Sequence, residues 1–554
     1  IVPSGNRGVI HISSLVSSFR TYRRDNFPWL VLAMAGGFWL VGMLIQIWRL
    51  ESLSATYDQA LFLQELWSTA RGHFFESSLS SELSAAVRLH DALPSVDYLH
   101  LGQHPNVLTL LGAPLVALLG RWALPLIQVG LLALAGLVLW RMAVVRLPRS
   151  LAIRLTAAYY LSGTVIGPAI ENFHDFCWLP LLGFLVVDGL LKQGWRQVMF
   201  CSCLMLLVRE DSGLTLFSLG LWATVRRPGA RLMGVVLMTI SFVYVTAMTG
   251  WIQPQFDDSV SDRFVQEKFG HLMQGRSGGT LSLLWIMLSH PFRLLEALLS
   301  PPLATLGFLL APALPLAFIP LISIDVALMV SVPLFVALVS QGMSALSVTL
   351  RYVMVFVPGL FAGAMLWWQA HPKFWSRVWF HRFWTGCIAL GLVITLVSNP
   401  YRSLSALVPD SFQPWVHVPP SAMLKRAGVA HRAARLIPDN ASVSADVPLL
   451  PLLAEREVAL RFPNHVEYSN RQGEVRSVEW VLAFLDYYRP FMPLFRQETS
   501  RWRSINKGLS KLMEEGRYGV VNCADGLVVL RNGVDSSPDA QRCLDALLAV
   551  EPEK

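Results

Sequence analysis

Long apolar stretches are the feature that most constrains how this chain can fold. Residues 29–48, 123–140 and 232–251 are each long enough to cross about 30 Å of hydrocarbon as a helix. Lipid cannot satisfy backbone polar groups, so a crossing segment must be a helix or part of a closed barrel. Because these stretches are apolar throughout and do not alternate with polar residues, they predict membrane-spanning helices.

The composition excludes an ordinary soluble enzyme. Only 15% of the residues are charged, 54% are hydrophobic and the mean hydropathy is +0.48, whereas soluble domains carry about 25% charged residues. About eleven spans are predicted, at residues 28–48, 123–146, 151–170, 177–192, 196–208, 212–225, 231–251, 303–322, 324–340, 352–369 and 383–398. The expected fold is an all-α polytopic membrane bundle.

The distribution of arginine and lysine predicts the orientation of this bundle. Cationic residues concentrate on the cytoplasmic side of membrane proteins. The connections 141–154, 226–231 and 373–382 are rich in basic residues, whereas the loop 49–104 and the bend 170–176 are mainly acidic. We therefore expect the N-terminus in the cytoplasm and the acidic segments outside, in a multi-pass protein of the bacterial plasma (inner) membrane.

Three regions follow from this topology. We expect a cytoplasmic N-terminal arm at residues 1–27, a transmembrane domain at 28–399 with an exterior loop at 49–104, and a soluble extracytoplasmic domain at 400–554. In the exterior loop, apolar residues recur at helical spacing and predict an amphipathic helix on the membrane surface. Residues 252–300 predict a lid followed by an interfacial helix.

The C-terminal region predicts a small α/β domain. Residues 518–521 and 527–530 are short apolar runs that flank an Ala-Asp-Gly turn, as the strands of a hairpin would. Cys523 and Cys543 are the cysteines of this region. Because an extracytoplasmic domain lies in an oxidising compartment, we expect them to form a disulfide.

Ionisable residues at the ends of spans are costly in a membrane and therefore mark candidate sites. Asp58 follows the first span, where it can cap the helix that begins at Gln59 or act as a general base. Arg209, Glu210 and Asp211 interrupt an apolar stretch between two half-length helices. These three residues form either a self-neutralising group or a phosphate site, since arginine is the natural partner of a phosphate.

The acidic bend 170–176 is a second candidate. Glu171 and His174 are three residues apart, followed by Asp175. A glutamate and a histidine at this spacing can share a helix face and hold a divalent cation or a phosphate-bound ion. The alternative is a solvated polar turn, so the use of a metal is left open.

His104 and the pair Arg351-Tyr352 each begin an apolar segment on the outer side. Arg351 departs from the positive-inside trend, and its alternative role is an interfacial anchor. The sequence contains no nucleotide-binding loop. An enzyme acting outside the cytoplasm would take its activated donor from the membrane, and polyprenyl-phosphate sugars are the expected class.

The order of these motifs resembles a family of bacterial predicted membrane proteins of unknown function that is related to the GT-C glycosyltransferases. The resemblance is carried by residues 57–72, His104, 172–174, 209–211, Arg351-Tyr352, 437–439 and 461–463. It implies a GT-C-like bundle with an outward-facing site and Asp58 as base or metal ligand. The chain departs from the family pattern at Gln103 and Asn172, where the family usually has aspartate, and both changes weaken a metal site.

Two functions remain open at this point. In the first, the chain is a glycosyltransferase in which Asp58 deprotonates an acceptor hydroxyl and Arg209, with Arg351, stabilises the departing lipid phosphate. In the second, it is a non-catalytic lipid-linked glycan transporter or an envelope assembly factor. Internal inverted repeats, which would favour a transporter, are not evident in the sequence.

The transferase hypothesis predicts that Asp58, His174 and Arg209 line one outward-facing cavity, within about 10–15 Å of one another. The expected partners are membrane lipid and a polyprenyl-phosphate-linked sugar, and nucleic acid is not among them. The sugar, the acceptor, the metal and the oligomeric state are left open by the sequence.

Overall fold

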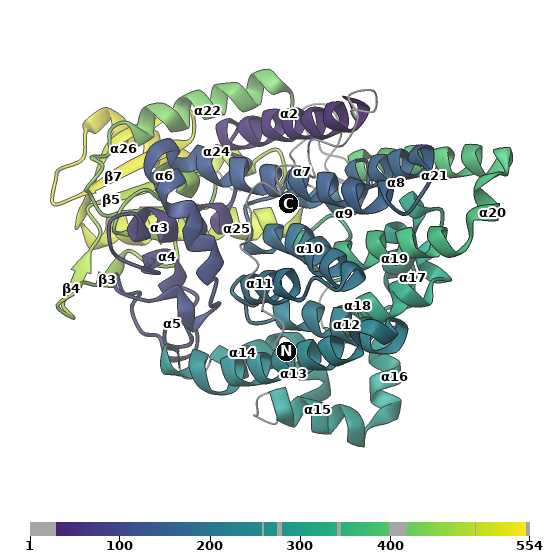
Figure 1. Ribbon diagram of the computed structural model, residues 1–554. Coiled ribbons are helices and arrows are strands. Elements are labelled where there is room, and N and C mark those ends of the chain that lie inside the picture. Colours follow the sequence, from purple (N-terminus) through teal and green to yellow (C-terminus); the bar gives the residue numbers. More distant parts are fainter. Residues whose placement is uncertain are drawn as a thin grey trace, which may run out of the picture.

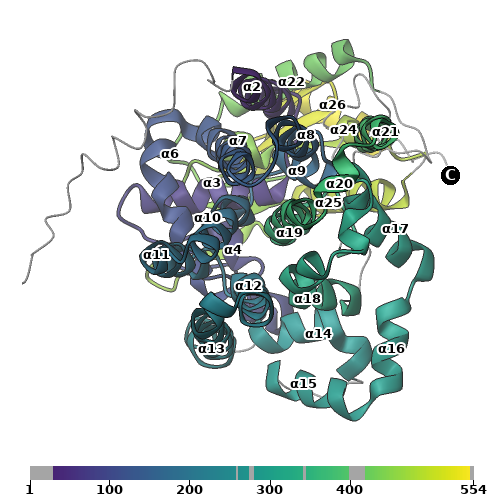
Figure 2. The same ribbon diagram turned by 45° about the vertical axis from the view of Figure 1, so that its right-hand side comes forward.

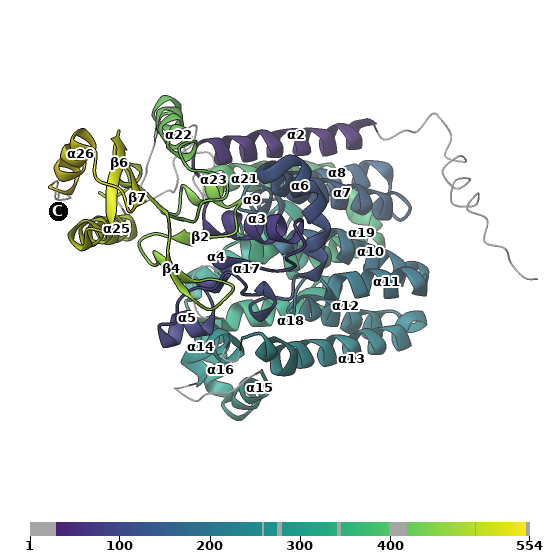
Figure 3. The same cartoon turned by 90° about the vertical axis from the view of Figure 1, so that its left-hand side faces the viewer.

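The computed structural model describes residues 29–257, 260–273, 280–340, 345–397, 418–493 and 495–549. These residues form a helical bundle with a mixed α/β domain at one end of it (Figures 1 and 3). The predicted N-terminal arm and the glycine-rich part of the predicted lid, residues 275–279, lie outside the described residues.

The bundle consists of helices that lie alongside one another, and Figure 2 shows many of them end-on. They are α2 (Trp29–Glu51), α6 (Ala113–Leu119), α7 (Ala123–Val144), α8 (Arg149–Tyr160), α9 (Gly163–Ala169), α10 (Trp178–Lys192), α11 (Trp195–Leu206), α12 (Ser212–Arg226), α13 (Arg231–Ala247), α17 (Pro302–Ala313), α18 (Ile324–Val339), α19 (Val357–Ala370) and α21 (Val378–Val397). The predicted interruption at Arg209–Asp211 is confirmed, because α11 and α12 flank these residues. The two helices are not halves of one span, however: Gln193 before α11 lies against Gly229 after α12, so the helices fold back on each other.

Fewer helices than predicted are long enough to span on their own. Among the described residues, four stretches are long and apolar enough to cross a membrane: Trp29–Glu51, Val107–Val144, Pro228–Gln255 and Val378–Val397. Each predicted span contains a helix, but the count of about eleven is not confirmed. The inner helices are short: α18, which contains Pro333 and so lacks one backbone donor, has 16 residues.

The predicted interfacial helix at 281–299 is two helices and not one. These are α15 (Thr280–Ser289) and α16 (Pro291–Leu299). Their apolar parts meet at a bend of 97°, and together they form a fifth candidate span. The bend lies at His290, because the residue before a proline is disfavoured in the helical region.

The first loop forms α3 (Tyr57–Thr69), α4 (Ser78–Ser81) and α5 (Ala85–His90), and the segment before α15 forms α14 (Val260–Met273). The prediction that the first of these helices lies on the membrane surface is wrong. Residues on every side of α3 are buried, including Leu63, Gln64 and Glu65. The helix is enclosed because the bundle packs against it from one side and the C-terminal domain from the other (Figure 3).

The C-terminal domain is built on a five-stranded mixed sheet of order β2-β1-β5-β7-β6. The strands are β1 (Val443–Ala445), β2 (Ala459–Arg461), β5 (Trp480–Phe484), β6 (Tyr518–Ala524) and β7 (Leu527–Asn532), and β3 (Glu467–Ser469) pairs separately with β4 (Val475–Ser477). Strands β2, β1 and β5 are parallel, whereas β5, β7 and β6 are antiparallel. The predicted α/β character and the β6–β7 hairpin are confirmed.

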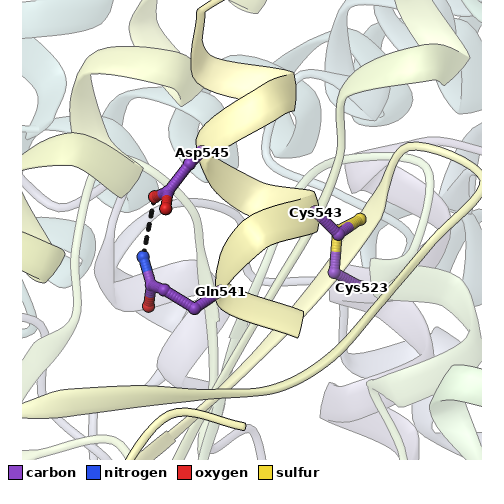
Figure 4. The surroundings of a disulfide bond; sticks show 4 residues. All are labelled: Cys523, Gln541, Cys543 and Asp545. Carbon is purple, nitrogen blue, oxygen red and sulfur yellow. Dashed lines mark hydrogen bonds between the residues drawn. A yellow bond between two sulfur atoms is a disulfide. The ribbon is translucent and has the colours of Figure 1, made fainter. Parts of the chain in front are cut away.

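Helices cover this sheet, and a disulfide fixes one of them to its edge. The helices are α22 (Pro420–Ala434), α23 (Leu450–Leu453), α24 (Leu485–Tyr488), α25 (Arg496–Glu515) and α26 (Pro538–Leu548). Cys523 of β6 is bonded to Cys543 of α26, with their Cα atoms 5.9 Å apart (Figure 4). The predicted disulfide is therefore confirmed.

Candidate functional site

The bend between α9 and α10 is held by amide side chains from neighbouring helices. Gln46 of α2 donates to the carbonyl of Glu171 over 2.6 Å, and Gln128 of α7 donates to the same carbonyl over 3.2 Å. The Gln128 carbonyl in turn accepts from the N–H of His174 over 2.9 Å. Because these amides are buried, they hold the backbone of the bend in one place and so fix where Glu171 and His174 point.

Arg351 joins two carboxylates from distant parts of the chain. Its Nη1 lies 2.6 Å from Oδ2 of Asp58 and 3.1 Å from Oε1 of Glu171. Its backbone N–H also donates to Glu171 over 2.5 Å. The backbone just before Arg351 packs closely against α9, and this contact requires a glycine there. A Cβ at Gly167 would lie 2.4 Å from the carbonyl oxygen of Thr349.

Asp58 lies in the first turn of α3, whose N-cap is Thr56, so it is not the helix cap that the sequence left open. Its side chain is 33% exposed. Burial alone would raise the pKa of its carboxyl, but the positive charge of Arg351, with that of Arg209, outweighs this effect and holds the pKa below its usual value. Asp58 is therefore a carboxylate at neutral pH.

Arg209 lies between α11 and α12 with its two neighbouring acids beside it. Its Nε is 3.4 Å from Oε1 of Glu210 and 3.3 Å from Oδ1 of Asp211. The self-neutralising arrangement considered from the sequence is thus present. The guanidinium also reaches the bend, because its Nη1 lies 3.4 Å from Nε2 of His174.

Two histidines extend this cluster. His174 Nδ1 lies 2.5 Å from Oδ1 of Asp175, and His104 Nδ1 lies 2.9 Å from Oε1 of Glu210. The structure therefore brings the predicted site residues from five separate segments into one charged cluster.

A mainly apolar cavity of about 130 Å³ adjoins the cluster, between α12, α18 and α14. Its polar wall includes Asp211, Lys268 and Tyr352. Its apolar lining is Phe176, Leu214, Pro333, Val336, Ala337, Ala345, Val355 and Phe356. Asp58, His174 and Arg209 themselves are not among the residues that line it.

Both arginines contact residues that line this cavity. The Arg209 guanidinium lies over the ring of Phe176, 4.8 Å from its centre, and Nη2 of Arg351 lies 3.4 Å from the Tyr352 hydroxyl. The charged cluster and the apolar cavity are therefore neighbouring parts of one region.

Within the described residues, no group of three or more His, Cys, Asp or Glu side chains is arranged to hold a metal ion. The contacts of Glu171 and His174 explain why these residues do not form such a group. Both oxygens of Glu171 accept hydrogen bonds from Arg351, and His174 faces Arg209. Cationic partners thus lie where the divalent cation considered from the sequence would have to bind.

The two departures from the family pattern have structural partners. Asn172 Oδ1 accepts from Arg49 Nη2 over 2.9 Å and from the N–H of Thr56 over 3.1 Å. Gln103 donates to the carbonyl of Ser80 over 2.6 Å. An aspartate at position 172 would face Arg49 and not a metal, so this change bears on packing rather than on catalysis.

Sequence reasoning missed Gln128, Lys268 and Arg49. A signal existed for Gln128 and Arg49, because a polar or charged side chain within a span or at its end needs a partner. Lys268 follows a run of charged residues, and nothing in the sequence separates it from a solvated lysine.

The sequence profile of a family described as "Predicted membrane protein (DUF2079)" matches residues 49–529. This match confirms the family resemblance inferred from the motifs. No functionally curated protein matches the chain.

Two crystal structures of ArnT from Cupriavidus metallidurans are similar to the chain. The one bound to undecaprenyl phosphate is 12% identical with a TM-score of 0.44, and the apo structure is 13% identical with a TM-score of 0.45. Each similarity covers 92% of this chain and 98% of ArnT. We draw no functional conclusion from likenesses this remote.

Proposed function

The chain belongs to the DUF2079 family of predicted membrane proteins, and we propose that this member is a GT-C-type membrane glycosyltransferase. It moves a sugar from a polyprenyl-phosphate donor to an acceptor on the extracytoplasmic side. The observation that carries the proposal is the contact of one carboxylate, Asp58, with Arg351, together with Arg209, which contacts His174 in the neighbouring bend, all beside an apolar cavity.

The arginines suit a lipid phosphate. A guanidinium offers a planar set of donors that matches phosphate oxygens, and charge-assisted hydrogen bonds are the stronger ones. Without donor, acids balance both cations: Asp58 and Glu171 at Arg351, Glu210 and Asp211 at Arg209. An incoming phosphate competes with these acids and releases Asp58 from Arg351.

The apolar cavity suits the lipid part of the donor. An isoprenoid chain that moves from the bilayer to this cavity is already out of water, so an apolar wall accepts it at little cost, whereas a wall of unpaired polar groups would not. With the first isoprene units against the apolar wall, the phosphate lies toward Asp211, Lys268 and Tyr352. Of these residues, Asp211 contacts Arg209 and Tyr352 contacts Arg351.

The proposed reaction is a direct displacement at the anomeric carbon. The acceptor oxygen forms the new glycosidic bond while its proton passes to Asp58 and later to water. The bond between the anomeric carbon and the phosphate oxygen breaks, and its electron pair leaves with the lipid phosphate. Arg209 and Arg351 stabilise the negative charge that develops there. The configuration at the anomeric carbon is inverted.

A reconstitution experiment tests the proposal. The full chain in liposomes is supplied with polyprenyl-phosphate sugars carrying a radiolabelled sugar and with a cell-envelope extract as acceptor. We expect label to move to the extract and free polyprenyl phosphate to accumulate, and Asp58→Asn to abolish both. Full activity of Asp58→Asn would exclude Asp58 as the general base. Movement of intact labelled donor across the bilayer, without cleavage, would support the transporter instead.

We also propose the orientation, with the N-terminus in the cytoplasm and the C-terminal domain outside. In a Cys203→Ser background, which removes the exposed free cysteine, Gln472→Cys should react with a membrane-impermeant maleimide on intact cells. Lys373→Cys, in a basic connection, is the control and should react only after lysis. The opposite pattern would reverse the topology.

A further inference from the structure

The C-terminal domain is hydrogen-bonded to the loop that carries Asp58. Ser78 of α4 pairs with strand β2: its hydroxyl donates to the carbonyl of Ala459 over 2.9 Å and accepts from the N–H of the same residue over 3.1 Å. Gln64 of α3 donates to the carbonyl of Arg456 over 3.1 Å. The edge of the sheet is thus closed by the first loop, and the domain and the loop form one unit.

Glu82, directly after α4, lies at the centre of this contact. Its side chain is 0% exposed. One carboxylate oxygen accepts from the N–H of Arg461 over 2.8 Å and lies 3.0 Å from Nδ1 of His465. Arg461 and His465 both belong to the C-terminal domain. A buried carboxylate requires such partners, and removing them would leave an uncompensated charge.

The other carboxylate oxygen of Glu82 faces the site. It lies 3.1 Å from the hydroxyl of Tyr57, which also donates to the carbonyl of Leu79, and the guanidinium of Arg461 lies over the Tyr57 ring, 4.9 Å from its centre. Tyr57 is the first residue of α3 and directly precedes Asp58. The C-terminal domain therefore reaches the candidate base through two side chains, Glu82 and Tyr57.

We propose that Glu82 is a positioning residue for the transfer reaction. Through its contact with Tyr57 it holds the first turn of α3, which includes Asp58, in a fixed position relative to the C-terminal domain. This inference rests on the proposed function for its catalytic consequence. The positioning of Asp58 by Glu82 does not depend on which reaction the protein catalyses. The domain is then a part of the active site's support and not an independent appendage.

The chain offers a matched control for simple domain docking. Glu76 and Arg471 form an ion pair of 2.5 Å across the same contact, between the first loop and the C-terminal domain. This pair is at the periphery and does not involve Tyr57. A variant at Glu76 therefore weakens docking without disturbing the path to Asp58.

The kinetic test uses the liposome assay with Glu82→Gln, Tyr57→Phe, their double variant and Glu76→Gln. We expect Glu82→Gln and Tyr57→Phe each to lower kcat about tenfold with KM for the lipid donor within about twofold, because misplacing a catalytic group affects the chemical step. The double variant should lose little more than either one, since the two residues act on one path. Glu76→Gln should keep wild-type kcat. Equal losses in Glu82→Gln and Glu76→Gln, or fully multiplicative losses in the double variant, would overturn the inference.

A second test does not depend on activity. In the Cys203→Ser background, Asp58→Cys is labelled with a maleimide, alone and with Glu82→Gln or Glu76→Gln. We expect Glu82→Gln to change the labelling rate severalfold and Glu76→Gln to leave it unchanged. An unchanged rate with Glu82→Gln refutes the positioning role. If the rate changes but no sugar transfer is found with any donor, the proposed function fails while the placement of Asp58 by Glu82 holds.

Discussion

Arg351 offers a perturbation that separates a structural from a catalytic role. The change is Arg351→Gln, which removes the guanidinium shared by Asp58 and Glu171. The side chain of Glu171 is 0% exposed, whereas that of Asp58 is 33% exposed. Breaking the two ion pairs therefore costs different amounts of folding free energy, and most of the loss comes from the buried pair with Glu171.

The magnitude follows from that burial. Removing one partner of a buried ion pair costs about 3–5 kcal/mol, and an exposed pair is worth less than about 1 kcal/mol. Because the backbone N–H at position 351 still donates to Glu171, we expect a loss of about 3 kcal/mol, at the lower end. Adding Glu171→Gln removes the unpaired charge and should recover most of that stability.

Activity should respond differently. Hydrogen bonds to charged groups contribute about 1.5–3 kcal/mol, so losing those from Arg351 to the leaving phosphate should lower kcat/KM about 10- to 150-fold. We expect this loss in Arg351→Gln and also in the double variant with Glu171→Gln.

The assay pairs thermal unfolding in detergent with label transfer in liposomes. Recovery of stability without recovery of transfer supports a role for Arg351 at the phosphate. If the double variant returns to within about threefold of wild-type kcat/KM, Arg351 is only a structural ion pair, and the reasoning is wrong.

Three further predictions concern stability. Asn172→Asp should raise stability by about 1 kcal/mol in thermal unfolding, since its carboxylate would pair with the buried Arg49; a decrease would show that the Arg49 side chain is not available to it. Burial raises the pKa of Asp446 to about 7, so the folded state keeps a proton that the unfolded chain loses near pH 4. This contribution is present below about pH 4 and lost as the pH rises through 7. Asp446→Asn should therefore flatten the decline in stability between pH 5 and 8, and an unchanged decline would exclude Asp446 as its source. Cys543→Ser should destabilise the C-terminal domain by about 3 kcal/mol because it opens the disulfide with Cys523; equal urea midpoints with and without reductant in the wild type would contradict this.

Features that depend on neighbouring residues could be predicted from the sequence. Apolar length predicted the helices, and the separation of α11 from α12 at Arg209 followed from charges within an apolar stretch. The β6–β7 hairpin followed from two short runs around a turn, and the disulfide followed from two cysteines in one region. The helices and the hairpin are local, because hydrogen bonding within a helix or across a tight turn joins residues that are close in the chain. The disulfide joins residues 20 positions apart, and its prediction needed only that both cysteines lie in one domain.

The tertiary structure alone decided which of the candidate residues meet. Asp58 and Arg351 are 293 positions apart, and Glu82 and Arg461 are 379 apart. The sequence identified Asp58 and Arg351 but not their ion pair, and it did not mark Glu82 at all. It also placed α3 on a membrane surface, although the bundle and the C-terminal domain enclose it. An amphipathic pattern shows that one face of a helix is covered, but not by what, since lipid and protein satisfy an apolar face equally well.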